Sequence, residues 1–426
     1  MRRREAWLWA TILASSAAFS GCGSSETTAG HGGSGGAATG PTAGAGTTTG
    51  KGPSTSTGSG AGGAPVQMGL SRVDTHSGTA VAGSSDVAIA PDGTLYVSWV
   101  DTMNGSPDLF VARSTDGGAT FGAAVMLDDA SIVPLVSMAR HPYIIASNEK
   151  VAVVFNDQPG NIYLYGSPTT SLAFGSPSMV GADLTTPFRD FPKALFLADG
   201  SLAVAWHGYA ASGARMYISR ESAGYVSEVA SSGAPGLPCE CCPLETMLTS
   251  AGDLLLAFRN NDNDTREMWL SRAPSGGTFT AFGALSTSEG TMSTCPMQGP
   301  RLAEPTPGSL FAVWSVRGST NTGSVFLSTS NDGGATWSGG ASLAGFTADE
   351  PTIAAGAPGH LFVTGVNGNA KSAMIASTDG GVTWSAPTKL TAPDGDLGTP
   401  QAKGLGGRAA FAAVSKAGTV WLNRME

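Results

Sequence analysis

An eight-residue segment occurs three times in this chain and constrains the fold more than any other feature. It reads Ser, any residue, Asp, Gly, Gly, any residue, Thr and an aromatic residue, and its copies begin at Ser114, Ser330 and Ser377. Each copy follows a short apolar run. Asp-Gly-Gly between apolar runs is typical of a hairpin turn, because glycine reaches positive φ at little steric cost and the carboxylate accepts backbone N–H bonds. Three near-identical copies indicate an internal repeat.

These octapeptides resemble the Asp-box, or BNR repeat, of sialidases and other β-propellers. The residues that carry the resemblance are Ser114, Asp116, Gly118, Thr120, Phe121, Ser330, Asp332, Gly334, Thr336, Trp337, Ser377, Asp379, Gly381, Thr383 and Trp384. In that family the box lies on the outer turns, away from the active site. The resemblance therefore implies a fold rather than a chemistry.

A longer unit recurs from residue 84 onward, and each copy begins with a polar or proline-containing segment followed by apolar strands. The units start roughly fifty residues apart, which suits four-stranded propeller blades. We therefore predict an all-β fold, a single seven-bladed propeller over residues 66–426, with six blades as the alternative. The seventh unit has only three strands before Glu426, so we expect residues 66–73 to supply the fourth and close the ring.

An aromatic residue ends five of the predicted second strands. These residues are Trp99, Phe155, Trp206, Phe258 and Trp314. Their recurrence at one repeat position favours packing between blades, and sugar-stacking platforms at the three tryptophans are the alternative.

The N-terminal segment is predicted to direct export. Residues 2–4 are arginines, and the apolar run over residues 6–19 is too short for a comfortable membrane span, so residues 1–22 read as a signal peptide. Residues 19–22 resemble a bacterial lipobox, which implies that Cys22 is lipidated and the chain anchored at the outer membrane or cell surface. Plain secretion is the alternative. Residues 23–65 are rich in Gly, Ala, Ser and Thr and are expected to form a disordered tether.

The charge balance limits the classes of partner. The chain has 23 Lys and Arg against 32 Asp and Glu, a net charge of −9, which argues against nucleic acid. A glycan or an extracellular protein is the expected ligand, and contact with a membrane is expected only through the lipid anchor. No cofactor is predicted, and we expect a monomer.

Charged side chains are scarce and gather in the loops before the innermost strands and after the second strands. In a propeller these loops share one face around the axis, opposite the octapeptide turns, so we predict a ligand site there. The candidate binding residues are Arg140, His141, Arg189, His207, Arg259, Arg317 and Gln298.

The sialidase resemblance implies a more specific chemistry. That family holds a substrate carboxylate with three arginines, for which Arg140, Arg189 and Arg259 are the candidates. It also uses paired carboxyl groups, and the candidate catalytic residues are Asp190, Glu350 and Asp86. The sequence leaves open whether the protein only binds its ligand or acts as a glycoside hydrolase of exo-alpha-sialidase type.

The cysteines offer a third possibility. Cys239, Cys241 and Cys242 precede one predicted blade and Cys295 precedes the next, and four cysteines besides Cys22 suit disulfides in an oxidising compartment. Cys242 and Cys295 occupy equivalent positions, so they are the expected pair, with Cys239 and Cys241 as further candidates. A soft-metal or redox site built from these four residues is the alternative.

Overall fold

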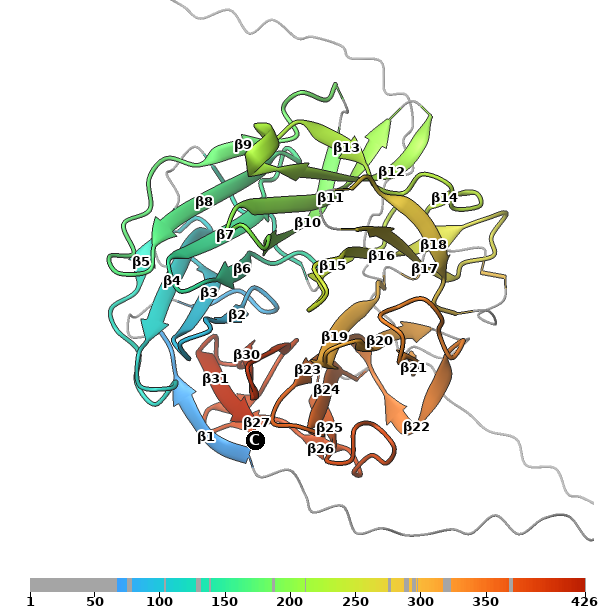
Figure 1. The fold of residues 1–426 in the computed structure, drawn as a ribbon. Helices are drawn as coiled ribbons and strands as arrows, with labels where there is room; N and C mark the ends of the chain where they lie inside the picture. Colours follow the sequence, from blue (N-terminus) through green and yellow to red (C-terminus); the bar gives the residue numbers. More distant parts are fainter. Residues whose placement is uncertain are drawn as a thin grey trace, which may run out of the picture. The chain divides into compact units, whose positions relative to one another are not determined.

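Each repeat unit of the sequence forms an antiparallel sheet, and the sheets stand around a common axis as propeller blades (Figure 1). Short turns join antiparallel neighbours, so the strands of a blade follow chain order from the axis outward. The structure is a computed structural model and describes residues 67–74, 79–102, 105–127, 132–137, 139–185, 188–210, 212–274, 277–286, 291–292, 296, 298–316, 323–367 and 371–425. Seven sheets of four or more strands occur in this part of the chain, which confirms seven blades rather than six.

The first three blades follow one another without a break in the pattern. Blade 1 contains β2 (Asp86–Ile89), β3 (Leu95–Asp101), β4 (Asp108–Ser114) and β5 (Val125–Met126). Blade 2 contains β6 (Tyr143–Ala146), β7 (Lys150–Asn156), β8 (Ile162–Pro168) and β9 (Ser178–Val180). Blade 3 contains β10 (Phe188–Phe196), β11 (Leu202–Ala210), β12 (Gly213–Arg220), the 3-10 helix η1 (Glu221–Ala223) and β13 (Ser227–Val229).

The next three blades include one additional strand and one additional hairpin. Blade 4 contains β14 (Leu237–Pro238), β15 (Glu245–Leu248), β16 (Leu254–Asn261), β17 (Met268–Ala273) and β18 (Thr280–Ala284). Blade 5 contains β19 (Arg301–Thr306), β20 (Ser309–Val316), β21 (Ser324–Ser330) and β22 (Ala341–Thr347). Blade 6 contains β23 (Asp349–Ala355), β24 (Leu361–Val366), β25 (Ser372–Ser377) and β26 (Thr388–Lys389), and the hairpin of β27 (Thr391–Ala392) and β28 (Gly395–Asp396) follows it.

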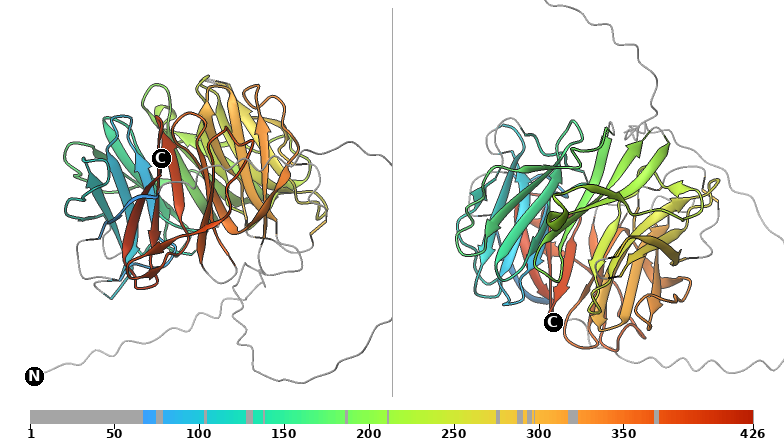
Figure 2. Two further views of the ribbon diagram at one scale, coloured as in Figure 1. Left: turned by 90° about the horizontal axis from the view of Figure 1, so that it is seen from below. Right: turned by 45° about the horizontal axis from the view of Figure 1, so that its top comes forward.

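Blade 7 is built from both ends of the propeller sequence. It contains β29 (Gln401–Leu405), β30 (Arg408–Val414), β31 (Val420–Met425) and, on the outside, β1 (Gln67–Arg72). β1 pairs antiparallel with β31 from Gln67 opposite Met425 to Arg72 opposite Trp421, so the N-terminal strand closes the ring as predicted. Figure 2 shows the strands of the blades running between the two faces of this ring.

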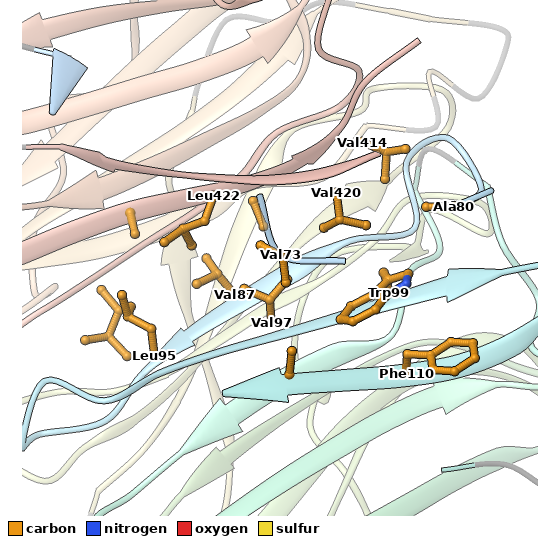
Figure 3. Close-up of a cluster of buried hydrophobic side chains, with 14 residues drawn as sticks. Val73, Ala80, Val87, Leu95, Val97, Trp99, Phe110, Val414, Val420 and Leu422 are labelled. Atoms are coloured by element: carbon orange, nitrogen blue, oxygen red, sulfur yellow. The ribbon is translucent and has the colours of Figure 1, made fainter. Parts of the chain in front are cut away.

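Apolar packing between the last and the first blade supports this closure. Val73, directly after β1, is fully buried with Val87 and Val97 of blade 1 and Leu422 of blade 7 (Figure 3). The backbone N–H of Val73 also donates to the carbonyl of Val420 at 2.9 Å. Hydrogen bonds and a buried cluster therefore join the two ends of the ring, with β1 as the outer strand of blade 7.

The aromatic residues at the ends of the second strands pack within the blades. Trp99, Trp206 and Trp314 each have no exposed surface. The Trp206 ring stacks on Tyr217 with centroids 5.8 Å apart, and Trp99 and Trp314 stack similarly on residues of their own third strands. Each of the three tryptophans also belongs to a buried cluster shared with the preceding blade, so the predicted packing between blades is confirmed. The alternative of sugar-stacking platforms at these tryptophans is wrong because a buried ring face cannot meet a ligand.

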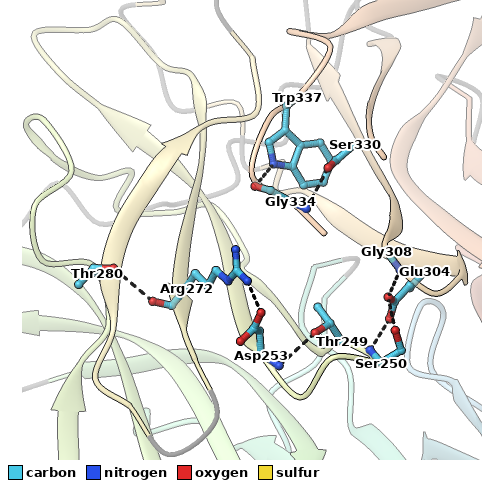
Figure 4. A network of polar contacts seen from close by, with 10 residues as sticks. All are labelled: Thr249, Ser250, Asp253, Arg272, Thr280, Glu304, Gly308, Ser330, Gly334 and Trp337. Atoms are coloured by element: carbon cyan, nitrogen blue, oxygen red, sulfur yellow. Dashed lines mark hydrogen bonds and ion pairs between the residues drawn. The ribbon is translucent and has the colours of Figure 1, made fainter. Parts of the chain in front are cut away.

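Each octapeptide forms a turn held by its own side chains. In blade 5, Ser330 donates to Asp332 at 2.8 Å, and Asp332 accepts the backbone N–H of Thr336 at 2.9 Å and its hydroxyl at 2.6 Å. Ser330 also accepts the N–H of Gly334, whose φ is 91°, and Trp337 donates to the Gly334 carbonyl (Figure 4). The other two turns repeat the Ser, Asp and Thr bonds. The predicted turn chemistry is therefore present.

The chain divides into two units, Met1–Ser59 and Gly60–Glu426. The predicted signal peptide, the predicted lipid attachment at Cys22 and the predicted tether over residues 23–65 lie outside the described residues. Within the described ranges, no helix has the length and apolar character needed to cross a membrane.

Candidate functional site

Seven residues occupy one equivalent position on the seven innermost strands. In blades 1 to 5, each of them pairs with a residue of the second strand. That partner comes directly before the aromatic residue of the same strand, which is Trp99, Phe155, Trp206, Phe258 or Trp314. We call these seven residues the axial ring: Asp86, Tyr143, Lys193, Glu245, Arg301, Thr352 and Gln401. Because the innermost strands surround the axis, this register brings one polar side chain from every blade to the centre.

A second layer lies two residues further along each innermost strand, where side chains point to the same face again. Its residues are Ala88, Ile145, Leu195, Met247, Ala303, Ala354 and Lys403, so a mostly apolar layer with a single charge follows the polar ring. A cavity of about 300 Å³, the axial cavity, is lined by six members of the axial ring and by Met247, Ala303, Ala354 and Lys403.

The axial cavity opens where the innermost strands end. Leu405, at the end of β29, is 42% exposed, whereas Lys193 and Gln401 in the ring are 4% and 2% exposed. In an antiparallel blade the first and third strands end at the same edge, and the octapeptides follow third strands. The mouth therefore lies on the side of the octapeptide turns, opposite the predicted face.

Two lysines approach the aromatic ring of Tyr143. The Lys193 Nζ lies 4.1 Å from the ring centre and the Lys403 Nζ lies 3.6 Å from it, which is cation–π contact. Lys403 also lies 4.0 Å from the Asp86 carboxylate, which accepts the backbone N–H of Ile144 at 3.1 Å. Blades 1, 2, 3 and 7 therefore meet in one polar cluster.

Arg301 of blade 5 forms ion pairs with carboxylates of blades 4 and 6. Its guanidinium lies 3.6 Å from the carboxylate of Glu245 on one side and 3.6 Å from that of Glu350 on the other.

Glu350 has φ of 45°, and Phe191 in the equivalent part of blade 3 has φ of 50°; each stands in a β-bulge directly before a proline. Strained residues of this kind concentrate at ligand sites, so the strain points to the same region of the molecule as the charges.

Burial shifts the ionisation of the ring. It raises the pKa of Asp86, with Lys403 opposing, and raises the pKa of Tyr143 to about 12. Burial also lowers the pKa of Lys193 to about 7, so this amine is half protonated near neutrality. Burial acts in the same direction on Lys403, but Asp86 and the other anionic neighbours outweigh it and raise its pKa. Burial thus moves the pKa of the Lys193 amine into the neutral range.

Several polar atoms of the axial ring are buried without a hydrogen-bond partner among the described residues. They are Asp86 Oδ1, Arg301 Nε and Gln401 Nε2, two donors and one acceptor. Buried polar atoms are rarely left unpaired, because each costs about 1–3 kcal/mol.

A wider hollow of about 450 Å³ lies beside the first octapeptide turn and is lined by Arg113, Phe121 and Leu172, among others. Its one charged side chain already donates to the Thr169 carbonyl. We favour the axial cavity as the site because charged groups from several blades converge there.

The predicted arginine cluster does not assemble. Arg189 donates to the carbonyls of Gly181 at 2.9 Å and Leu184 at 2.8 Å. Arg259, with no exposed surface, donates to three backbone carbonyls, those of Gln298, Arg266 and Ser315, at 2.9–3.1 Å. Both guanidinium groups are used to hold the chain together, and Arg317 lies outside the described residues.

The third arginine of that prediction pairs with a predicted catalytic acid. Arg140 Nε lies 2.8 Å from Asp190 Oδ1 and Arg140 Nη2 lies 2.5 Å from Asp190 Oδ2, while Glu350 is paired with Arg301. The two carboxylates are therefore bound to different arginines. Asp86 belongs to the axial ring, and Gln298 is structural, since its side-chain oxygen accepts the hydroxyl of Ser315 and the N–H of Glu350, both at 2.8 Å.

The two predicted binding histidines are buried and neutral. His141 is 8% exposed and His207 is not exposed, and none of their ring nitrogens has a hydrogen-bond partner in the described part of the chain. Burial lowers the pKa of His207 to about 4, and burial together with Lys193, Arg301 and Lys403 lowers that of His141 well below its usual value. The His207 ring contacts Tyr209 with centroids 4.8 Å apart. The neutral His141 therefore lies near the cations of the axial site, whereas His207 lies in an aromatic cluster.

The cysteines are arranged differently from the prediction. Cys242 carries a thiol, so the expected Cys242–Cys295 disulfide is wrong; the Cys242 Sγ lies 3.0 Å from the thiol sulfur of Cys239. Arg266 donates to the same Cys239 sulfur at 3.0 Å. Cys241 is the disulfide-bonded cysteine of this group, and Cys295 lies outside the described residues. Among the residues that the structure describes, no group of three His, Cys, Asp or Glu side chains could hold a metal ion.

The residues that the sequence interpretation missed are Tyr143, Glu245, Arg301 and Lys403. It assigned all four to predicted first strands, although five ring residues directly follow a proline at the start of a repeat, as Tyr143 follows Pro142 and Arg301 follows Pro300. Aligning the repeats on these prolines would have identified most of the ring from the sequence alone.

Fold and site together define the class: an all-β, seven-bladed propeller with a polar cavity on its axis. No family model matches the sequence, and no curated protein matches it either. Among solved structures, the polysaccharide lyase Uly1 matches with a TM-score of 0.49 and 8% identity over 83% of this chain and 99% of that chain. The alpha-L-arabinanase of Penicillium chrysogenum matches with a TM-score of 0.45 and 12% identity over 82% and 99%, and the Trypanosoma rangeli sialidase with 0.43 and 12% over 84% and 60%. These likenesses concern the propeller fold.

Proposed function

We propose that this propeller binds a sugar residue of a glycan in its axial cavity. The observation that carries the proposal is that Arg301 Nε and Gln401 Nε2, from two residues that line the cavity, are buried without a hydrogen-bond partner among the described residues. A sugar hydroxyl accepts hydrogen bonds, so a polyhydroxylated ligand in the cavity can satisfy both N–H donors at once.

The size and lining of the cavity support a small sugar unit. Its volume of about 300 Å³ is at the lower end of small-molecule sites. The second layer adds apolar contact through Met247, Ala303 and Ala354, between the polar ring and the mouth of the cavity. A mixed wall of this kind suits the face of a pyranose, which carries C–H groups as well as hydroxyls.

The proposal is binding without turnover. A sialidase-type site needs an arginine cluster, but Arg189 and Arg259 bond backbone carbonyls and Arg140 bonds Asp190. We further propose that the chain is exported, lipidated at Cys22 and tethered by residues 23–65, which would display the cavity to extracellular glycans. The sequence of residues 1–65 supports this part of the proposal.

A binding screen tests the proposed function. Mono- and disaccharides are titrated into the purified propeller by calorimetry, and the variants Gln401→Met and Gln158→Met serve as a matched pair, because Gln401 lines the cavity and Gln158 is exposed. We expect at least one sugar to bind, with affinity reduced about tenfold or more, or 1.4 kcal/mol, in Gln401→Met only. Absence of binding by every sugar, or an equal loss in both variants, would refute the proposal.

A further inference from the structure

Two cysteine thiols face each other in the segment that precedes the innermost strand of blade 4. The sulfur atoms of Cys239 and Cys242 lie 3.0 Å apart, and neither side chain has any exposed surface. A disulfide bond is about 2.05 Å long, so the two sulfurs need to approach each other by only about 1 Å to become bonded. Neither cysteine lines the axial cavity, so the pair is a feature separate from the proposed sugar site.

The backbone holds the two cysteines at this distance. The Cys242 N–H donates to the Cys239 carbonyl at 3.4 Å, which closes a turn over Glu240 and Cys241. The two ends of such a turn have Cα atoms within about 7 Å, and disulfides join Cα atoms that are about 4.4–6.8 Å apart. Cys239 and Cys242 also have the Cys-x-x-Cys spacing, which is typical of disulfides formed within one turn. The turn therefore places the pair within range of a bond.

The surroundings of Cys239 fix its position and suit it for reaction. Its backbone N–H donates to the Arg259 carbonyl at 2.8 Å, which ties it to the second strand of blade 4. Arg266 Nη1 lies 3.0 Å from the Cys239 sulfur, and Arg266 Nε donates to the Met292 carbonyl at 2.8 Å. A guanidinium beside a sulfur favours the thiolate, which is the nucleophilic form of cysteine. Cys239 is therefore the thiol that reacts first.

We propose that Cys239 and Cys242 form a disulfide bond when the chain folds in an oxidising compartment. The oxidant is a small disulfide such as glutathione disulfide. The Cys239 thiolate attacks one of its sulfurs and releases one glutathione, and the Cys242 thiolate then attacks the Cys239 sulfur of the mixed disulfide and releases the second. The two cysteines lose two electrons and two protons, and the two glutathione thiols receive them. Cys241 keeps its own disulfide throughout.

Burial decides when the bond forms and how long it lasts. Because neither sulfur is exposed in the folded propeller, the oxidant reaches them before blade 4 is packed, and reductants are excluded afterwards. The bond then closes the chain between β14 and β15, three residues before Glu245 of the axial ring. It is thus a structural disulfide, and the predicted export of the chain would supply the oxidising compartment.

Peptide mapping tests the proposal, because Glu240 lies between the two cysteines. The full-length chain is produced in the periplasm of a bacterial host, where disulfides form, and its thiols are blocked with iodoacetamide under denaturing conditions without reduction. A protease that cleaves after glutamate then separates residues 229–240 from residues 241–245. We expect mass spectrometry to find the two fragments linked, and to find them apart after reduction. Separate fragments before reduction, with iodoacetamide on Cys239 and Cys242, would overturn the proposal.

Single-cysteine variants identify the bonded pair. In Cys242→Ser the two fragments should separate and Cys239 should carry iodoacetamide, and in Cys239→Ser the same should hold for Cys242. Fragments that stay linked in Cys242→Ser would show that Cys239 is bonded to Cys241, which would also overturn the proposal. Thermal unfolding shows whether each variant is folded. If neither variant folds, the fragment 241–245 of the wild type is sequenced in the mass spectrometer while still linked, and a link at Cys241 in place of Cys242 refutes the proposal.

Discussion

Arg140 and Asp190 form a two-point ion pair across neighbouring blades, with Arg140 Nε 2.8 Å from Asp190 Oδ1 and Nη2 2.5 Å from Oδ2. The Asp190 side chain is 1% exposed and that of Arg140 is 15% exposed. The Arg140 guanidinium also lies 4.6 Å from the centre of the Phe191 ring. The two charges are therefore paired with each other, and the pair joins the segment that precedes blade 2 to the innermost strand of blade 3.

Breaking this pair should cost stability. We expect Asp190→Asn to lower the free energy of unfolding by about 3 kcal/mol, because the arginine is left partly buried without its carboxylate. The measurement is urea denaturation of Asp190→Asn, Arg140→Met and the double variant. Additive effects of the two substitutions would contradict the pairing, since a coupled pair loses most of its energy with the first change.

Arg259 should matter for stability and not for ligand binding. Arg259→Met leaves three buried carbonyls without their donor, so we expect a loss of about 3 kcal/mol or more in the free energy of unfolding. Arg408→Met, at an exposed arginine, should change it by less than about 0.5 kcal/mol. If Arg259→Met abolished sugar binding while keeping full stability, the arginine-cluster hypothesis would have to be revived.

His207 should make the propeller sensitive to acid. Its pKa is about 4 in the folded protein and about 6.5 when unfolded, so the unfolded chain binds more protons between these values. Its contribution to stability is therefore full above pH 6.5 and is lost as the pH falls towards 4, by about 3 kcal/mol in all. In His207→Phe, which keeps a ring against Tyr209, this loss should disappear. A stability difference that stays constant from pH 7 to 4 would rule the explanation out.

The octapeptide aspartates should stabilise their turns except in strong acid. Bonds from Thr383 and Ser377 lower the pKa of Asp379 to about 2. Asp379→Ala should lower the melting temperature at pH 7, and the difference from the wild type should shrink as the pH falls from about 4 to 2, because the wild type then loses the same bonds. Val382→Ala in the same turn, where the side chain is 81% exposed, is the matched control and should leave the melting temperature unchanged.

Much of the fold could be predicted because it depends on interactions between residues that are close in sequence. Ser330, Asp332 and Thr336 bond to one another within seven residues, so their spacing alone specifies the turn. The recurrence of apolar runs gave the blade count, and the three-stranded last unit gave the closing strand β1. The turns and the apolar runs are short-range features that repeat along the chain, whereas the long-range pairing of β1 with β31 was inferred from the incomplete last unit.

The candidate site was harder to predict because it depends on partners distant in sequence. Arg259 was a reasonable ligand for a carboxylate until the fold supplied the carbonyls of Gln298 and Ser315, 39 and 56 residues away. Cys242 likewise was matched with Cys295, but its sulfur lies beside Cys239. Residue type and loop position could nominate these side chains, but could not show which groups they contact.

The sequence by itself indicated a repeated strand-rich unit with hydrogen-bonded turns, because such patterns act over a few residues, and its incomplete last unit indicated a closing N-terminal strand. Only the tertiary structure decided that Tyr143, Lys193, Glu245 and Arg301 share one ring. It also decided that Arg189 and Arg259 donate hydrogen bonds to backbone carbonyls. The physical reason is that closing the ring sets the register of every innermost strand against the axis, and a shift of one residue would turn those side chains away from it.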